Sequence, residues 1–149
     1  AELAALDVRD LAEDADGATA FFRRGKADQE GEGDFRFVAG STFARVAAWV
    51  KAAGLPPGAP LFAPLGPAAR NGRLSPGDIY AIVRRRCGAR YSAHSTRVGA
   101  ALDAKAAGAT TGAIQQAGGW KSERMVARYT ERLSTRESAA AMLAEKQGR

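Results

Sequence analysis

The chain has 149 residues, of which 46% are hydrophobic and 26% are charged, a composition typical of a globular protein with its own core. Its single cysteine excludes an internal disulfide, and no apolar run approaches the roughly 20 residues that a membrane-spanning helix needs. The chain opens without a basic-then-apolar secretory signal, which favours a cytoplasmic location.

Basic charge is concentrated in the second half of the chain. Residues 81–149 hold thirteen Lys/Arg and five Asp/Glu, whereas residues 1–80 hold nine and eleven. The formal net charge of +6 therefore originates beyond residue 80. A positive face attracts a polyanion, and nucleic acid is the commonest one. The alternative is a basic surface that serves only solubility.

The first third of the chain predicts short elements. Residues 2–6 have the pattern of the end of a helix, and residues 8–11 that of a turn or the entry to a short strand. Residues 19–23 and 34–38 are aromatic-rich and flank a polar, glycine-rich stretch. They predict two strands of a small antiparallel sheet, joined by a long exposed loop. Because the chain begins inside an apparent helix, we interpret it as a piece of a longer protein.

Helices are predicted from residue 41 onward. Ser41 is a candidate N-cap for a helix that ends at Gly54, with an inward face at i, i+3, i+4, i+7 spacing formed by Phe43, Val46, Ala47 and Val50. After a Pro/Gly-rich loop, cap and stop residues predict helices over residues 75–87, 92–107, 110–117, 122–132 and 134–146. The expected fold is α+β, mostly α, with a small antiparallel sheet near the N-terminus.

His94 and Arg97 lie three positions apart on a predicted helix, so they share one face. An imidazole and a guanidinium aimed at one point suit a phosphate, because arginine offers a bidentate fork and histidine gives or takes a proton. An exposed helix pair without a role is the alternative.

Trp120 follows two glycines, and its indole N–H is a donor that could reach a phosphate oxygen. Tyr129 lies among arginines, which can activate its phenol as a nucleophile. Taken singly, each has a plainer interpretation: Trp120 as a core anchor and Tyr129 as an ordinary amphipathic tyrosine.

Order and spacing link these four residues, which are separated by 3, 23 and 9 positions. Residues 92–101 (SAHSTRVGAA), 114–120 (IQQAGGW) and 125–129 (MVARY) follow one another in the chain. In that order they resemble the second signature box, the third catalytic position and the nucleophile segment of the tyrosine site-specific recombinases, the phage integrase family. Most members of that family place histidine where Trp120 stands, and some place tryptophan.

The resemblance is weaker before residue 92. Residues 1–6 look like the helix just after the family's first catalytic arginine, Lys26 looks like the family's hairpin lysine, and Leu61-Phe62 resembles a short family segment. The first catalytic arginine would lie two residues before Ala1. The resemblance therefore implies an N-terminally truncated catalytic domain, 1–149, that lacks the core-binding domain and is inactive alone.

The resemblance implies DNA integration or recombination by transesterification, without metal, ATP or other cofactor. Tyr129 would attack a backbone phosphorus to form a 3′-phosphotyrosyl link, and Lys26 would protonate the departing 5′ oxygen. Arg97 would stabilise charge on the non-bridging oxygens, and His94 would hydrogen-bond the phosphate or move the Tyr129 proton. Trp120 would donate its N–H and pack the site.

By the same resemblance, Glu2 would orient neighbours of the reacting groups. Lys26 has a simpler alternative as a solvated loop charge.

Five basic residues are expected to contact DNA phosphates without reading sequence: Arg84, Arg85, Arg86, Arg90 and Lys121. The first three also suit the C-terminal end of a helix, so part of that cluster is structural. The arginines around Tyr129 stay open between phosphate contacts and solvated charges.

The last predicted helix, 134–146, is amphipathic. In similar proteins the segment after the tyrosine docks into a neighbouring subunit, which implies a homo-oligomer, a tetramer on double-stranded DNA. Packing on its own domain is the alternative. Two other functions stay open: a module that binds DNA without cutting it, and a type IB topoisomerase, which shares the tyrosine chemistry without exchanging strands. The block from Ser92 to Tyr129 matches the recombinases better.

Overall fold

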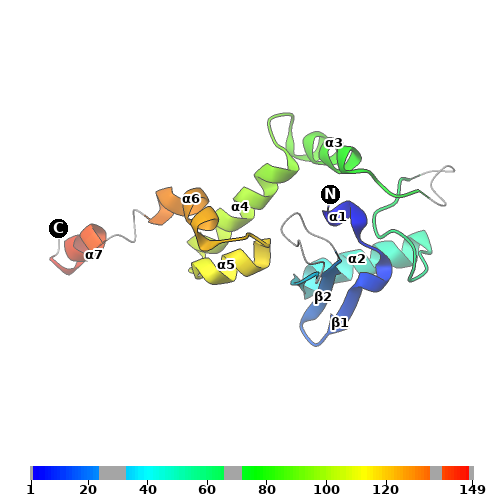
Figure 1. Ribbon diagram of the computed structural model, residues 1–149, viewed down its shortest axis with the longest axis horizontal. Coiled ribbons are helices and arrows are strands. Elements are labelled where there is room, and N and C mark those ends of the chain that lie inside the picture. The colour runs from blue at the N-terminus through cyan, green and yellow to red at the C-terminus, as the bar shows by residue number, and fades with distance from the viewer. Residues whose placement is uncertain (1, 24–32, 66–71, 135–138, 148–149) are drawn as a thin grey trace. The chain divides into compact units, whose positions relative to one another are not determined.

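The computed structural model describes residues 2–23, 33–65, 72–134 and 139–147. The chain divides into two compact units, Ala1–Arg90 and Tyr91–Arg149. The first contains a small sheet and three helices, and the second is helical throughout its described part (Figure 1). The predicted α+β class, mostly helical with an antiparallel sheet near the N-terminus, is confirmed. Within the described part of the chain, no helix combines the length and apolar character that crossing a bilayer requires.

The described part of the first unit contains seven elements. In chain order they are α1 (Glu2–Ala5), a 3-10 helix (Val8–Asp10), β1 (Leu11–Asp14), β2 (Gly17–Phe22), β3 (Asp34–Ala39), α2 (Gly40–Ala53) and α3 (Pro76–Cys87).

The sheet has three antiparallel strands in the order β1-β2-β3, one more than predicted. The extra strand, β1, begins at Leu11, the last residue of the segment 8–11 that was predicted as a turn or the entry to a short strand; the rest of that segment is the 3-10 helix. The acidic residues of β1 disfavour a strand, so the residue pattern did not show that the strand continues to Asp14. Its pairing places Asp14 opposite Gly17 across a two-residue turn. The two predicted strands are confirmed with shifted ends, Gly17–Phe22 and Asp34–Ala39.

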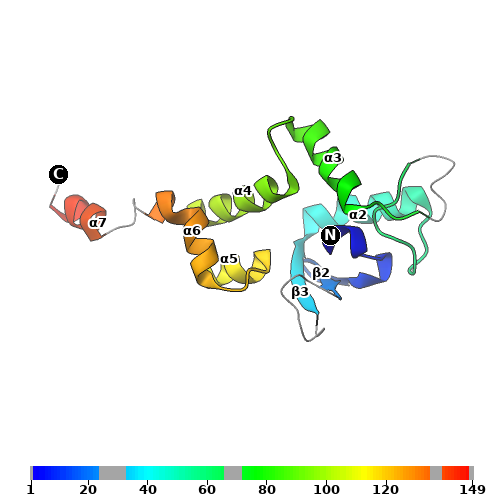
Figure 2. The same ribbon diagram turned by 45° about the horizontal axis from the view of Figure 1, so that its top comes forward.

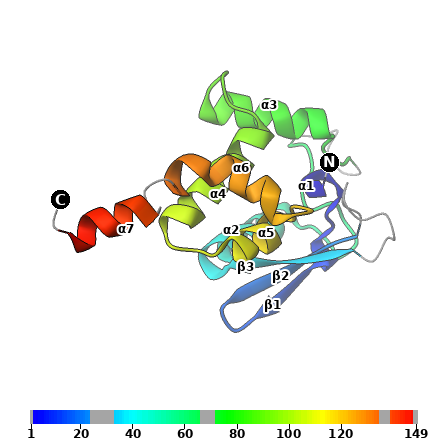
Figure 3. The same ribbon diagram turned by 60° about the vertical axis from the view of Figure 1, so that its left-hand side comes forward.

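Helix α2 covers one face of the sheet, which Figure 3 shows. Strand β2 buries Ala20 and Phe22 in a cluster with Leu6 and Leu61, and Val46 of α2 packs against that cluster. Val50 also packs there, and Phe43 is half-buried. Ala47 was predicted on the inward face of this helix but is exposed. The helix turns Trp49 inward instead, and the indole N–H of Trp49 donates to the Leu61 carbonyl at 2.9 Å.

The helix ends follow local chemistry, with one exception. Ser75 caps α3 by accepting the Asp78 backbone N–H, with Pro76 in the first turn, and Gly54 ends α2 in the left-handed conformation, both as predicted. The predicted cap at Ser41 is wrong, because α2 begins at Gly40 directly after β3. The Gly40 N–H is satisfied instead by the Asp16 carbonyl at 3.1 Å.

The second unit contains α4 (Ala93–Ala106), α5 (Thr111–Gly118), α6 (Glu123–Ser134) and α7 (Ala139–Lys146). Helices α4, α5 and α6 pack on one another (Figure 2). The buried cluster between them consists of Ala101, Ile114, Trp120 and Val126. The predicted start of the last helix at Ser134 is wrong, because Ser134 ends α6. Glu137, the other half of the predicted capping box, lies outside the described residues.

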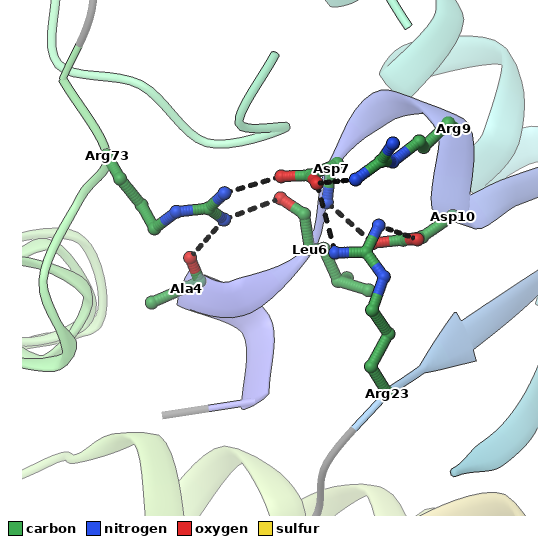
Figure 4. A network of polar contacts seen from close by, with 7 residues as sticks. All are labelled: Ala4, Leu6, Asp7, Arg9, Asp10, Arg23 and Arg73. Carbon is green, nitrogen blue, oxygen red and sulfur yellow. Dashed lines mark hydrogen bonds and ion pairs between the residues drawn. The ribbon is translucent and has the colours of Figure 1, made fainter. Parts of the chain in front are cut away.

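An ion-pair network ties together distant parts of the first unit (Figure 4). The Asp7 carboxylate is buried and accepts hydrogen bonds from Arg73 and Arg23, and Arg23 also donates to Asp10. Arg73 donates in addition to the Ala4 carbonyl in α1 at 2.9 Å and to the Leu6 carbonyl just after it at 3.1 Å. The network therefore holds α1 against the end of β2 and the segment before α3.

The Asp7 carboxylate should make the protein acid-sensitive. The hydrogen bond from Arg73 has the largest effect on the pKa of Asp7 and lowers it; burial opposes this, and the bond from Arg23 lowers the pKa further. A carboxylate with a depressed folded-state pKa stabilises the fold above its unfolded value of about 4, and this stabilisation is lost as pH falls through the folded pKa.

We expect Asp7→Asn to lose about 2–3 kcal/mol of unfolding free energy at neutral pH, because charge-assisted hydrogen bonds contribute about that much. Urea titrations between pH 6 and 3 should show a shallower acid loss in Asp7→Asn than in the wild type. Asp103→Asn removes an exposed carboxylate of α4 and is the control. Equal acid sensitivity of Asp7→Asn and wild type would contradict the assignment.

Candidate active site

Four of the predicted catalytic side chains lie together in the second unit. His94 and Arg97 come from α4, Trp120 follows α5, and Tyr129 comes from α6. The ring centroids of His94 and Tyr129 are 5.6 Å apart in an edge-to-face arrangement, and those of Trp120 and Tyr129 are 6.3 Å apart. Residues that span 36 positions of the sequence thus meet at one place.

The N-terminal turn of α4 fixes the pair His94 and Arg97. Ser92 caps the helix by accepting the Ser95 backbone N–H, and the Ser95 hydroxyl accepts the Ser92 N–H in return. Because the helix begins there, His94 falls in the first turn, where it is exposed, and Arg97 falls one turn later, where it is half-buried. The i, i+3 spacing places both on one face, as predicted.

Arg97 is held by two contacts around Trp120. Its guanidinium carbon lies 4.7 Å from the centroid of the Trp120 ring, and one η nitrogen donates to the Gly119 carbonyl at 2.9 Å. Its Nε is enclosed, and no acceptor among the described residues reaches it. Such a buried donor is costly and calls for an explanation.

Trp120 is placed by the way α5 ends. Gly119 is left-handed, with φ 61° and ψ 45°, its N–H donates to the Gln116 carbonyl, and the Trp120 N–H donates to the Gln115 carbonyl at 3.1 Å. This is the Schellman pattern, which turns the residue after the glycine back onto the last turn of its helix. Trp120 is consequently 8% exposed and sits in the core with Ile114. It anchors the core and also supports Arg97.

Tyr129 is half-buried at the edge of the same core, beside the fully buried Val126. Its ring packs against His94 and Trp120, and its hydroxyl makes no hydrogen bond to another described side chain. Thr130 is turned inward and bonds the Val126 carbonyl at 3.1 Å. The helix therefore directs the phenol toward the edge of the core, on the side of the imidazole.

Two predicted catalytic residues belong to the first unit. Lys26 lies outside the described residues. Glu2 is half-buried in α1 and forms an ion pair with Arg36 of β3 at 3.2 Å. Arg36 also pairs with Asp34 at 2.9 Å and lies over the Phe22 ring. Within the first unit, the partner of Glu2 is thus Arg36, a residue that the sequence pattern did not single out.

The five residues predicted to contact DNA are all exposed. Arg84, Arg85 and Arg86 form the last turn of α3, where their charge also suits the helix dipole. Arg84 donates to the Tyr80 hydroxyl at 2.8 Å and lies over its ring. Arg90 ends the first unit, and Lys121 follows directly after Trp120.

The sequence predicted that this helix ends at Gly118 and Gly119, but it did not predict that Gly119 is a partner of Arg97. Gly119 supplies both the left-handed turn and the carbonyl that Arg97 binds. Two glycines before a large aromatic residue are the signal for the left-handed turn, because the Schellman motif pairs a left-handed glycine with an apolar residue.

No family model matches the chain, and no curated protein matches it. The motif resemblance to the tyrosine recombinases therefore has no support from a family model. No group of three or more His, Cys, Asp or Glu side chains suited to a metal ion occurs among the described residues.

Proposed function

We propose that this chain is the catalytic domain of a tyrosine site-specific DNA recombinase. The observation that carries the proposal is the cluster of His94, Arg97 and Tyr129, in which the His94 and Tyr129 rings lie 5.6 Å apart. A phenol, an imidazole and a guanidinium in one place are the groups that nucleophilic attack on a phosphodiester requires.

In the proposed reaction the Tyr129 oxygen forms a bond to a DNA phosphorus as the bond to the 5′ oxygen breaks. The phenolic proton leaves toward His94 or solvent, and Lys26 protonates the 5′ oxygen. Arg97 stabilises the negative charge that grows on the non-bridging oxygens. A 5′-hydroxyl of a partner strand then reverses the reaction, so the phosphodiester energy is conserved.

Trp120 has a positional role in this scheme, because an indole neither gives nor takes a proton at ordinary pH. Stacked under the guanidinium, it fixes the plane in which Arg97 presents its donors. Glu2 would act indirectly, because its ion pair is with Arg36 and not with a reacting group.

The exposed arginines at the end of α3 fit a role in holding the DNA backbone. Replacing Arg84, Arg85 and Arg86 by glutamine together should flatten the dependence of log affinity on log salt by about one for each phosphate that the protein no longer neutralises, so by up to about 3. Fluorescence-anisotropy titrations of labelled duplex between about 50 and 200 mM salt measure this slope. Arg45→Gln, an exposed arginine of α2, is the control. An unchanged slope in the triple variant would remove α3 from the interface.

Helix α7 fits the proposed contact with a second copy. Met142 and Leu143 are 61% and 54% exposed, so the apolar part of this helix is uncovered within its own chain. Such a helix suits the apolar groove of a neighbouring subunit. The resemblance to the tyrosine recombinases implies that the working form is a homo-tetramer on double-stranded DNA.

A nicked suicide substrate tests the proposal with the full-length protein that contains this domain. Cleavage next to the nick releases a short strand that cannot return, so the protein should stay covalently joined to DNA and migrate as an adduct in denaturing gels. Peptide mapping should place the nucleotide on Tyr129. A protein that binds the duplex and forms no adduct would be a binding module instead. An adduct that relaxes supercoiled DNA without ever exchanging strands would indicate a type IB topoisomerase.

A further inference from the structure

The last turn of α5 leaves no room for a side chain at Gly118. A Cβ added there would lie 2.6 Å from Cη2 of Trp120 and would overlap Cε3 and Cζ3 of the same ring. The backbone at Gly118 is helical and would accept alanine. The three atoms nearest to such a Cβ all belong to the Trp120 ring, so the indole is the main obstacle to a side chain.

The indole cannot easily move away. The Schellman turn at Gly119 directs it onto the helix, and Ile114 and Val126 enclose it in the core. Its ring also supports Arg97 at 4.7 Å and lies 6.3 Å from the ring of Tyr129. A methyl group at position 118 would push the ring toward one of these neighbours.

We propose that Gly118 is a positioning residue for the site: by having no side chain, it lets Trp120 take the place from which it orients Arg97. The proposal rests on the catalytic role of Arg97 proposed above. It also makes Gly118 specific to tryptophan, because a smaller ring at position 120 would leave space for a methyl group. Gly118 and Trp120 therefore act as a pair.

Four proteins test the pair: the wild type, Gly118→Ala, Trp120→His and the double variant. In single-turnover cleavage of the suicide substrate by the full-length protein, Gly118→Ala should form adduct about 100-fold more slowly, since a displacement near 1 Å costs about that much. In the Trp120→His background, Gly118→Ala should slow adduct formation by less than about 2-fold, because the smaller ring no longer clashes with the added methyl group.

A control separates this effect from helix damage. Alanine normally stabilises a helix relative to glycine. Gly112→Ala in α5, whose added Cβ would meet only the flexible Glu123 carboxylate at 3.3 Å, should raise Tm by roughly 2–4 °C and leave the cleavage rate unchanged. An equal loss of rate from Gly118→Ala in both backgrounds would overturn the proposal, because it would show that the loss comes from a disturbed α5 and not from a clash with the Trp120 ring.

A second readout does not depend on cleavage. In the 149-residue chain with Trp49→Phe, Trp120 is the sole tryptophan, and Gly118→Ala should shift its emission to longer wavelength as the ring leaves the core. An unchanged emission would overturn the positioning role. If the wild type forms no adduct, the recombinase assignment fails, and this emission shift alone decides whether Gly118 positions Trp120.

Discussion

Replacing Tyr129 by phenylalanine is expected to abolish the covalent protein–DNA adduct and to leave folding and DNA binding intact. The phenol oxygen is the proposed nucleophile, so without it no phosphorus–oxygen bond forms. The ring itself should keep its packing against His94 and Trp120, and the hydroxyl bonds no other described side chain. Denaturing gels of trapped suicide substrate measure the adduct, and anisotropy titrations measure binding.

Tyr80→Phe is the matched control for this loss. Tyr80 is 44% exposed on α3, and its hydroxyl accepts only the surface hydrogen bond from Arg84. The control should give the adduct in wild-type amount. An adduct that persisted in Tyr129→Phe would show that another residue attacks the DNA.

Arg97→Lys is expected to slow cleavage by about 10²- to 10³-fold, although it preserves the positive charge. A guanidinium stacks on an aromatic ring and offers donors in a planar fork, whereas an ammonium on a flexible chain does neither. Lysine at position 97 would therefore lose both the stack on Trp120 and the bond to the Gly119 carbonyl. Single-turnover rates at saturating protein separate this loss from weaker DNA binding.

Arg128→Lys makes the same exchange one position before the nucleophile, at an exposed site, and should change the rate by less than about 3-fold because the exposed charge is kept. Thermal unfolding of Arg97→Lys checks its structural contribution, which we expect to be about 1 kcal/mol from the missing stack. Full activity in Arg97→Lys would mean that charge alone matters and that the stacked geometry has no role.

Local chemistry predicted most of the helices. Proline at a first turn, a serine cap and a left-handed glycine act within a few residues, so the boundaries around Ser75, Ser92 and Gly54 follow from the chain itself. Only the entry to strand β1 was predicted, at residues 8–11, because the stability of the strand comes from pairing with β2 and not from its acidic residues. The division near Arg90 has no linker composition that could reveal it.

The candidate site was predicted in its members but not in its supports. Order and spacing indicated His94, Arg97, Trp120 and Tyr129, whose clustering the structure shows. The bond from Arg97 to the Gly119 carbonyl could not be predicted, because a backbone carbonyl carries no residue signature. Contacts between distant side chains could not be predicted either. Asp7 and Arg73 are 66 positions apart, and nothing in the sequence around either residue indicates that they form a pair.

All four clustered side chains come from residues 91–149, which have a hydrophobic core of their own. Their geometry therefore depends on a short stretch of sequence and few packing positions, Val126 foremost among them. Substitutions in this cluster, at Ala101, Ile114 or Val126, would therefore disturb the arrangement of the four side chains directly. Inheritance of the four-residue arrangement thus requires that these packing positions are kept together with the four residues themselves.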